Sequence, residues 1–287
     1  MKDKIVLITG ATGGIGKAAA MELAKKQFTV IIHGRNKAKT QQVCEEIRMI
    51  TGNSKVDYLV ADLFLIAETK QLIREFKEKY ERLDVLINNA GGLMSNEREN
   101  TAEGIEKTIA VNLFAPFLLM NGLSNLLKAS PEARIINVSS NSHKLNAKPD
   151  FTDLQLVNGY NPLRSYGNSK LFLIWISQYL AKELKEQGIG HVTVNTLHPG
   201  AVATGFGTNS NLGPFMNTLA KWMRPFFRTP EKGADTIVYL ATSEEAQKVS
   251  GKYFVNRKQA RVTEKYYTTA NEKLVWDYCE KEVSKVE

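Results

Sequence analysis

Short apolar runs alternate with amphipathic segments along most of the chain. The apolar runs are rich in Val, Ile and Leu and show no polar alternation, which is typical of strands that are buried on both faces. The segments between them carry apolar residues at helical spacing. The pattern predicts strands over 4–10, 28–34, 55–63, 83–91, 133–140 and 191–200, and helices over 16–27, 38–50, 67–80, 111–128 and 165–187.

This alternation predicts an α/β fold of the Rossmann type, with a doubly wound parallel β-sheet in a three-layer αβα sandwich. Right-handed crossovers place helices on both faces of such a sheet, and ligands bind at the carboxyl ends of its strands. No internal repeat or low-complexity linker interrupts the sequence, so we expect a single domain over 1–287. Its cofactor half is expected over about 1–130 and its catalytic and substrate half over about 131–287.

Composition narrows the classes of partner and location. The net charge of +8 is spread over helical segments rather than packed into one basic block, which argues against nucleic-acid binding. Two cysteines suit a reducing compartment, and no signal-peptide run or membrane-length apolar run is visible, so we expect a cytoplasmic protein. The histidines and cysteines show no metal-ligand spacing, so no metal is expected.

The first expected strand runs into the segment TGATGGIG, in which Gly10, Gly14 and Gly16 are spaced G-x-x-x-G-x-G. Glycines permit a tight turn and let backbone N–H groups approach a pyrophosphate at a helix N-terminus. Because the pattern follows a strand and opens a helix, it predicts a dinucleotide site, with a plain tight turn as the alternative. Thr12 and Ile15 lie in the same turn and are candidate cofactor contacts.

The end of the second expected strand, IIHGRN, indicates which dinucleotide binds. NAD sites usually carry an acidic residue here, whereas this chain has Gly34 followed by Arg35 and Asn36. An arginine fork suits a 2′-phosphate, and no carboxylate at this place repels it. We therefore expect NADP(H) in preference to NAD, with Arg35 and Asn36 as contacts.

The segment SYGNSK places Tyr166 and Lys170 four residues apart, ahead of a long apolar helix. The two side chains then project from one helix face. A neighbouring cation favours the phenolate, so we expect the pKa of Tyr166 to be lowered towards the range that is useful for proton transfer. On these residues alone, an incidental pair at a helix start is the alternative.

Five motifs together resemble those of the short-chain dehydrogenase/reductase family along nearly the whole chain. They are TGATGGIG, NNAG, NVSS, YGNSK and HPGAVAT. Tyr166 follows Ser140 by 26 residues, and this long insert, like the later RTPEKGADTIVYL segment, resembles the retinol dehydrogenase and protochlorophyllide reductase-like branch. The resemblance implies an NADP(H)-dependent enzyme that transfers hydride between nicotinamide and a carbonyl or alcohol.

The resemblance also implies roles for individual residues. Tyr166 would be the general acid or base, and Lys170 would hold the nicotinamide ribose and lower the tyrosine pKa. Ser140 would hydrogen-bond the substrate oxygen, Asn112 would hold a water of the proton relay, and Asp62 would bind the adenine amino group. The other implied cofactor contacts are Leu63, Asn89, Ala90, Gly91, Pro199, Gly200, Val202 and Thr204.

The expected substrate loop, about 205–230, is rich in Phe, Met and Trp with basic residues among them. We interpret it as cover for a lipophilic substrate such as a retinoid, a sterol or another aldehyde or ketone. Ordinary core cover, and a peripheral membrane contact through 206–228, are the alternatives. His143 is a further candidate for lining the pocket, or has no chemical role.

A homodimer is a further candidate assembly. Two other functions compete with an NADP(H)-dependent oxidoreductase. One is a non-catalytic dinucleotide-binding regulatory or scaffold protein, whose usual mark would be loss of the tyrosine, lysine or serine. The other is light-driven tetrapyrrole reduction, although no sequence feature marks a large porphyrin pocket.

Overall fold

The computed structural model describes residues 3–94, 96–202 and 228–286. Its strands are β1 Ile5–Ile8, β2 Thr29–Gly34, β3 Val56–Val60, β4 Val85–Asn88, β5 Ala133–Val138, β6 Val192–His198, β7 Tyr253–Val255 and β8 Lys258–Ala260. The helices are α1 Gly14–Lys25, α2 Lys37–Thr51, α3 Ile66–Lys79, α4 Lys107–Ile109, the π-helix η1 Ala110–Phe114, α5 Ala115–Gly122, α6 Ser124–Ala129, α7 Ser142–Leu145, α8 Pro162–Glu186, α10 Pro230–Thr242 and α11 Thr269–Ser284.

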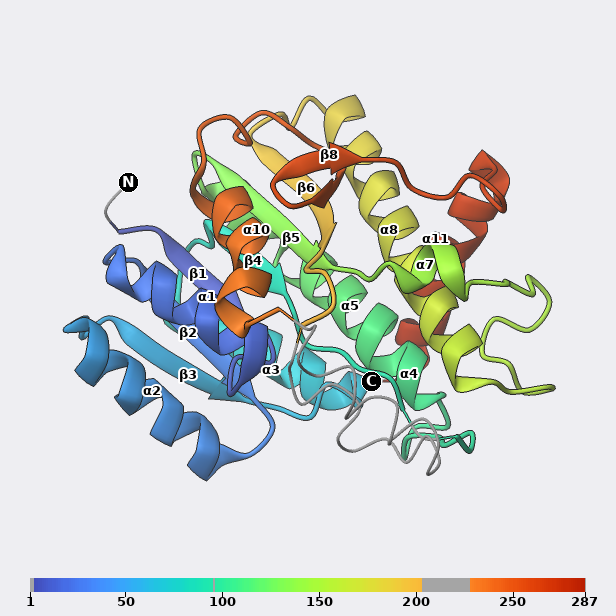
Figure 1. The fold of residues 1–287 in the computed structure, drawn as a ribbon, viewed down its shortest axis with the longest axis horizontal. Helices are drawn as coiled ribbons and strands as arrows, with labels where there is room; N and C mark the ends of the chain where they lie inside the picture. The colour runs from blue at the N-terminus through green and yellow to red at the C-terminus, as the bar shows by residue number, and fades with distance from the viewer. Residues whose placement is uncertain (1–2, 95, 203–227, 287) are drawn as a thin grey trace.

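The strands form one eight-stranded sheet in the order β3-β2-β1-β4-β5-β6-β7-β8 (Figure 1). Neighbours from β3 to β7 pair in parallel, and β8 pairs antiparallel with β7. Helices cover both faces of the sheet, so the predicted α/β Rossmann-type sandwich is confirmed. The strand order reverses between β1 and β4, which is where ligands bind in such sheets.

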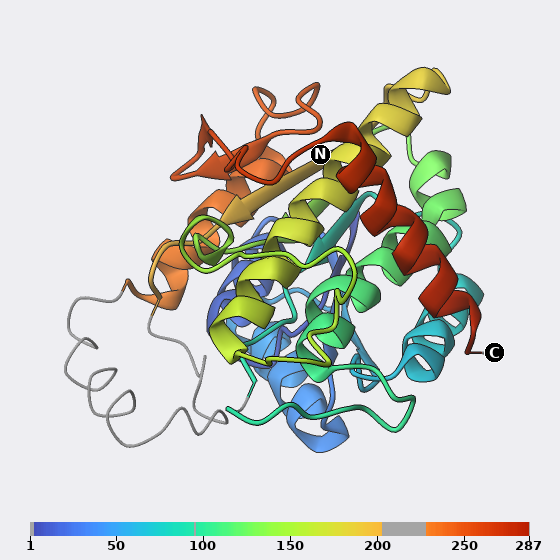
Figure 2. The ribbon, with the colours of Figure 1, turned by 90° about the vertical axis from the view of Figure 1, so that its right-hand side faces the viewer.

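Alternate residues of each strand feed two separate hydrophobic layers. In β1, Val6 and Ile8 pack with residues of α1, α2 and α10, whereas Leu7 packs on the opposite face with residues of α3, α5 and α8. Successive side chains of a strand point to opposite faces of the sheet, so both faces are apolar and the runs read as continuous. Figure 2 shows α11 lying alongside α8 as an outer cover of the second layer.

The predicted helix over 111–128 differs from the structure. The chain becomes helical at Lys107, passes through the π-helix η1, and divides at Leu123 into α5 and α6. A Cβ at Gly122 would lie 2.6 Å from Cδ1 of Ile73, so this glycine allows α5 to pack closely on α3. Apolar periodicity cannot reveal a π-turn or a break, because both keep the same residues on the buried side.

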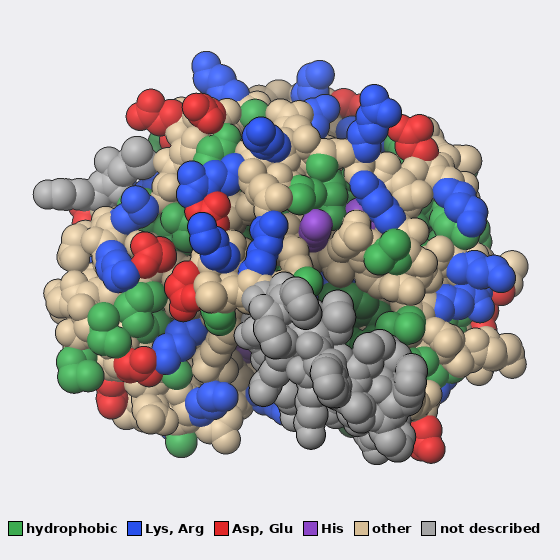
Figure 3. Space-filling view, in the orientation of Figure 1, with side chains coloured by type: hydrophobic (Ala, Val, Ile, Leu, Met, Phe, Trp, Pro, Cys, Tyr) green, Lys and Arg blue, Asp and Glu red, His purple; other side chains and the backbone are tan. Residues whose placement is uncertain are grey.

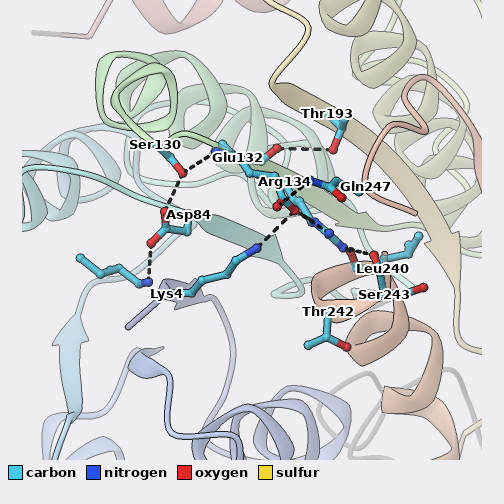
Figure 4. Close-up of polar contacts among 12 residues, drawn as sticks. Lys4, Asp84, Ser130, Glu132, Arg134, Thr193, Leu240, Thr242, Ser243 and Gln247 are labelled. Carbon is cyan, nitrogen blue, oxygen red and sulfur yellow. Dashed lines mark hydrogen bonds and ion pairs between the residues drawn. The ribbon is translucent and has the colours of Figure 1, made fainter. Parts of the chain in front are cut away.

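Polar side chains tie together the amino ends of β1, β4 and β5 (Figure 4). Asp84 accepts hydrogen bonds from the backbone N–H of Ile5 at 2.7 Å and from Ser130 Oγ at 2.6 Å. Arg134 is 3% exposed. Its Nη1 donates to the carbonyl of Leu240, in the last turn of α10, and to the carbonyl of Ser243, which follows α10, each at 2.8 Å. This network links the strands at their amino ends, on the side of the sheet that is remote from the predicted site.

Glu132 neutralises Arg134 in this network. It accepts from Arg134 Nε at 2.8 Å and pairs with Lys4 at 3.2 Å. Burial by itself would raise the pKa of Glu132, but the hydrogen bond and charge of Arg134, together with Lys4, lower it below its ordinary value. Glu132 is therefore a carboxylate at neutral pH, and the buried arginine is compensated.

Lys and Arg side chains are spread among acidic and other residues on the face shown in Figure 3. Within the described ranges, no helix has both the length and the apolar content needed to cross a bilayer.

Candidate active site

Most of the predicted site residues line one cleft at the carboxyl ends of the strands, with a volume of about 1410 Å³. Asn36 and Asn112 are exceptions that do not line it, and Thr204 lies outside the described residues. The predicted residues that do line it are Gly10, Thr12, Gly14, Ile15, Gly16, Arg35, Asp62, Leu63, Asn89, Ala90, Gly91, Ser140, Tyr166, Lys170, Pro199, Gly200 and Val202.

The glycine turn is shaped by close backbone contacts. Gly10 and Gly14 have φ of +64° and +54°, a region that side chains disfavour. A Cβ at Gly10 would lie 2.9 Å from Ala90 Cα, and one at Gly16 would lie 2.6 Å from Gly10 O. α1 begins at Gly14 with no side-chain cap and no acidic residue in its first turn, among the residues described. Its first N–H groups and positive dipole end suit a pyrophosphate.

The side chain of Asn89 holds this turn against β4. Its Nδ2 donates to the carbonyls of Thr9 at 2.9 Å and Gly10 at 3.2 Å. In return, the backbone N–H groups of Asn89 and Ala90 both donate to Thr9 Oγ1, each at 3.0 Å. The NNAG segment therefore fixes the glycine turn in addition to lining the cleft.

Arg35 lies at the rim of the cleft, with its side chain 61% exposed. Its Nη1 is 3.7 Å from Asp62 Oδ2, and its Cζ lies 5.8 Å from the centroid of the Phe64 ring. These partners orient the guanidinium and leave it open to solvent. Asn36, by contrast, caps α2 by accepting from the backbone N–H of Lys39 at 2.9 Å, so its side chain has a structural use.

Gly34 is fixed by packing as well as by chemistry. A Cβ there would lie 2.3 Å from Thr12 Cγ2 and 2.4 Å from Thr40 Oγ1. Both atoms belong to short branched side chains that cannot move far. The missing carboxylate at the end of β2 is therefore also a steric requirement of the glycine turn.

Tyr166, Lys170 and Ser140 meet on the floor of the cleft. Tyr166 and Lys170 are 7% and 3% exposed, and Lys170 Nζ lies 5.7 Å from the centroid of the Tyr166 ring. The same Nζ donates to the carbonyl of Val138 at 3.0 Å, and a hydrogen bond links the side chains of Tyr166 and Ser140. The helical spacing thus does bring the two side chains together beside the serine.

The expected lowering of the Tyr166 pKa is wrong in this structure. Burial raises the pKa of Tyr166 to about 12, although the hydrogen bond from Ser140 opposes the rise. Burial also lowers the pKa of Lys170 to about 7, so near neutral pH its amine is only partly protonated. Desolvation disfavours the charged form of each group, and it is the largest cause of both shifts.

Asn112 lies in the middle of η1 and is fully buried. Its Nδ2 donates to the carbonyls of Gly92 and Thr108, each at 2.9 Å, and its Oδ1 accepts from the N–H of Gly92 at 3.1 Å. A Cβ at Gly91 would lie 2.3 Å from Asn112 Oδ1 and 3.0 Å from Lys170 Nζ. Asn112 therefore locks the segment after β4 beside the lysine. Its water-holding role stays a prediction.

Two buried side chains that position the site do not stand out in the sequence. His33 Nδ1 accepts from the N–H of Gly10 at 3.3 Å and its Nε2 faces the carbonyl of Ala61 at 3.0 Å, so one neutral ring joins the ends of three strands. Glu106 accepts from the N–H of Ile109 at 2.9 Å and from Ser165 Oγ at 3.0 Å. It thereby joins the helix of Asn112 to the helix of Tyr166.

Comparisons with known proteins agree with this geometry. The model of the short chain dehydrogenase family matches residues 4–213. Human polyprenol dehydrogenase is 36% identical over 277 residues, which cover 95% of this chain and 82% of that protein. Human retinol dehydrogenase 14 is 35% identical over 297 residues, which cover 98% and 86%. A short chain dehydrogenase from Shigella flexneri, solved with NADP, has a TM-score of 0.69 at 26% identity and covers 90% of this chain and 98% of its own.

The chain belongs to the short-chain dehydrogenase family. Its resemblance to the retinol dehydrogenase-like branch, expected from the long insert between Ser140 and Tyr166, is confirmed. This short-chain dehydrogenase is therefore an oxidoreductase that acts on alcohol or carbonyl groups, and its family binds a nicotinamide dinucleotide.

Proposed function

We propose that this short-chain dehydrogenase is an NADP(H)-dependent enzyme that interconverts a lipophilic carbonyl compound and the corresponding alcohol. One observation carries the proposal: Tyr166, Lys170 and Ser140 line the same cleft as an uncapped helix N-terminus and a glycine turn. The first three supply proton transfer and substrate orientation, and the last two supply a dinucleotide site.

The residues around the glycine turn suit the dinucleotide. The α1 N-terminus and the turn would hold the pyrophosphate, and Lys170 would hold the nicotinamide ribose. Asp62 has its Oδ1 engaged by the N–H of Phe64 at 3.1 Å and its Oδ2 near Arg35, and it would meet the adenine from this position. When bound, the cofactor supplies or accepts the hydride.

Proton transfer is the task of this chain's own residues. Tyr166 is a neutral phenol at pH 7, since its ordinary pKa of 10 already lies above neutrality and burial raises it to about 12. A neutral phenol is the form that can donate a proton to a carbonyl oxygen. In reduction, the Tyr166 O–H bond breaks as the substrate's new O–H bond forms, while Ser140 orients the same oxygen. In oxidation, the proton returns to the phenolate.

We also propose a preference for NADP(H) over NAD(H). Arg35 offers an exposed guanidinium at the end of β2, where Gly34 leaves no room for a carboxylate. Lys39 lines the cleft nearby and adds positive charge. Lys17 does not contribute in this way, because it pairs with both oxygens of Glu46 at 2.7 Å. The NADP complex of the Shigella flexneri protein supports this choice of cofactor.

A lipophilic substrate is supported by the apolar side of the cleft. Leu145 and Leu163 line it while 74% and 37% exposed, and Leu93 and Met94 line it as well. Large aliphatic side chains that stay exposed at a cleft suit apolar ligands. The names of the polyprenol and retinol dehydrogenases support the same class of substrate. The expected loop 205–230 lies mostly outside the described residues, so its interpretation as substrate cover stays a proposal, as do the membrane contact and the homodimer.

The test is turnover. Purified protein is mixed with NADPH or NADH and a panel of retinals, polyprenals, sterol ketones and short aldehydes, and loss of reduced cofactor is followed. We expect turnover of a long-chain carbonyl with NADPH and little turnover of short aldehydes. Failure of every carbonyl in the panel, with NADPH still bound, would favour the non-catalytic dinucleotide-binding alternative instead.

A further inference from the structure

Three aromatic side chains gather behind the wall of the cleft next to Ser140. His143 comes from α7, His198 ends β6, and Tyr253 begins β7. The Tyr253 ring packs edge-on against His143 with centroids 4.9 Å apart, and stacks with His198 at 6.0 Å and 12°. His143 and Tyr253 are 0% and 2% exposed, whereas His198 lines the cleft. The cluster thus reaches from the cleft into the core.

The polar atoms of this cluster are buried without hydrogen-bond partners. Within the described chain, Nε2 of His143, both ring nitrogens of His198 and the hydroxyl of Tyr253 make no hydrogen bond. A buried polar group left in this state costs about 1–3 kcal/mol, and most such groups in native proteins bind protein or ordered water. Both ring nitrogens of the other buried histidine, His33, are by contrast engaged.

The protonation state of His143 follows from its one strong contact. Its Nδ1 lies 2.6 Å from the carbonyl of Ser140, which can only accept, so Nδ1 carries the proton. Burial lowers the pKa of His143 and of His198 to about 4, and Lys144 lowers both further, with Arg228 and His143 acting on His198. The rings are neutral at pH 7, and Nε2 of His143 is an acceptor that needs a donor.

His143 also controls the position of Ser140. The Ser140 carbonyl accepts from Nδ1 of His143 and from its backbone N–H at 3.2 Å. The hydroxyl of the same serine meets Tyr166 and accepts from the N–H of Ser142 at 3.2 Å. A shift of the His143 ring would therefore move the serine that faces Tyr166.

We propose that His143, Tyr253 and His198 form a buried site for ordered water, and that this hydrated cluster makes His143 a positioning residue for Ser140. The ligand is water because the cluster is neutral and needs both a donor, for Nε2 of His143, and an acceptor, for the Tyr253 hydroxyl. Water can donate and accept at once, and the two to four polar partners that a buried water requires are available among the unpartnered atoms of the three side chains. The role of Ser140 in this inference rests on the proposed function.

The experiment combines four variants with two readouts. His143→Leu removes both ring nitrogens, whereas His143→Asn places an amide donor near the Nδ1 position and serves as the conservative rescue. Tyr253→Phe removes only the hydroxyl. His191→Asn is the matched control, since that residue is exposed and its ring hydrogen-bonds to the carbonyl of Lys128 at 3.1 Å, away from the cluster. The readouts are high-resolution crystal structures of wild type and variants, and kcat and KM with NADPH and the carbonyl found by the screen.

The expected results separate positioning from simple structure. The wild-type crystal structure should show water within hydrogen-bond distance of Nε2 of His143 and of the Tyr253 hydroxyl. His143→Leu should lower kcat by about 10- to 100-fold, the scale of a misplaced reacting group, with the KM for NADPH little changed. His143→Asn should recover most of that loss, Tyr253→Phe should show a smaller loss of kcat, and the His191→Asn control should match wild type.

Three results would overturn the inference. One is a dry cluster in the wild-type crystal structure. The second is a Ser140 that stays in place, with wild-type kcat, in His143→Leu. The third is equal loss in His143→Leu and His143→Asn, which would indicate a packing role. Failure of the proposed function would look different, because wild type itself would then reduce no carbonyl while the crystal structures still decide whether water fills the cluster and whether Ser140 moves.

Discussion

Buried polar groups near the amino ends of the strands differ from those near the carboxyl ends in how many hydrogen-bond partners they have. At the amino ends of the strands, Arg134 donates to Glu132 and to two backbone carbonyls, and Asp84 accepts from Ile5 and Ser130 (Figure 4). Near the carboxyl ends, buried atoms of Asn88, of His143, of His198 and of the Tyr253 side chain that stacks on His198 have no partner within the described ranges. The polar side chains at the amino ends are hydrogen-bonded to one another and to the backbone, whereas several polar atoms near the carboxyl ends lack a protein partner.

This difference separates stability from function. A saturated network fixes the chain, because loss of any one partner leaves another buried group unpaired. Polar atoms without protein partners lower stability, and they persist where a ligand or water supplies the missing partner. Changes at the amino ends of the strands should therefore alter folding and spare chemistry, whereas changes at the carboxyl ends should mainly alter chemistry.

The largest effect is expected for Tyr166→Phe, in the cleft at the carboxyl ends of the strands. The ring and its packing remain, but the proton donor is lost, so turnover should fall by about 10²–10⁴-fold. NADPH binding and the melting temperature should change little. Tyr179→Phe is the control, because Tyr179 lies on the same helix but stacks on Trp276, at a centroid distance of 4.7 Å. Wild-type turnover in Tyr166→Phe would show that Tyr166 and Lys170 are an incidental pair at a helix start and have no catalytic role.

The converse experiment is Arg134→Met, at the amino ends of the strands. It leaves two carbonyls near the end of α10 without their donor and part of the Glu132 charge uncompensated, so the free energy of unfolding should fall by about 3–5 kcal/mol. Urea denaturation measures the loss, and NADPH affinity of the folded protein should stay unchanged. Lys273→Met removes an exposed ion pair with Asp277 and should leave the free energy of unfolding nearly unchanged. Equal effects of the two variants would contradict the comparison.

A smaller effect is expected for Arg35→Ala. The charge-assisted contact with a 2′-phosphate contributes about 1.5–3 kcal/mol, so the preference for NADPH over NADH should fall by about tenfold or more. Calorimetric titration with both cofactors measures the ratio. Lys17→Met is the control, since that ammonium is already paired with Glu46. Equal affinity of wild type for the two cofactors would rule out the proposed preference. Gly34→Asp is a poor test, because its Cβ would collide with Thr12 and Thr40.

The smallest effect, counted for one histidine and one pH unit, concerns acid stability. His33, His143 and His198 have pKa values of about 4 in the folded protein, against 6.5 for a free histidine. Between these values the unfolded chain binds more protons, so the free energy of unfolding should fall as the pH drops from 6.5 towards 4. Each histidine contributes a slope of about 1.4 kcal/mol per pH unit. Urea unfolding of His143→Asn over this range should show a slope smaller by about one proton, and an unchanged slope would contradict the assignment.

Local sequence determined the architecture and the ends of the strands where chemistry lies. Continuous apolar runs such as 28–34 predict a two-sided sheet, because side-chain alternation puts apolar residues on both faces. Gly10, Gly14 and Gly16 predict the turn from backbone freedom, and Tyr166 and Lys170 meet because helix geometry brings residues four apart together. Each of these inferences needs only neighbouring residues.

Tertiary structure decided what depends on residues far apart in the sequence. Desolvation set the pKa values of Tyr166 and Lys170, in the direction opposite to that expected from the pair alone, because burial is a property of the whole fold. The contacts of His143, His198 and Tyr253 also come from three separate elements, and no local spacing marks them. Periodicity predicts which face of an element is buried, but only packing decides which polar atoms find partners there.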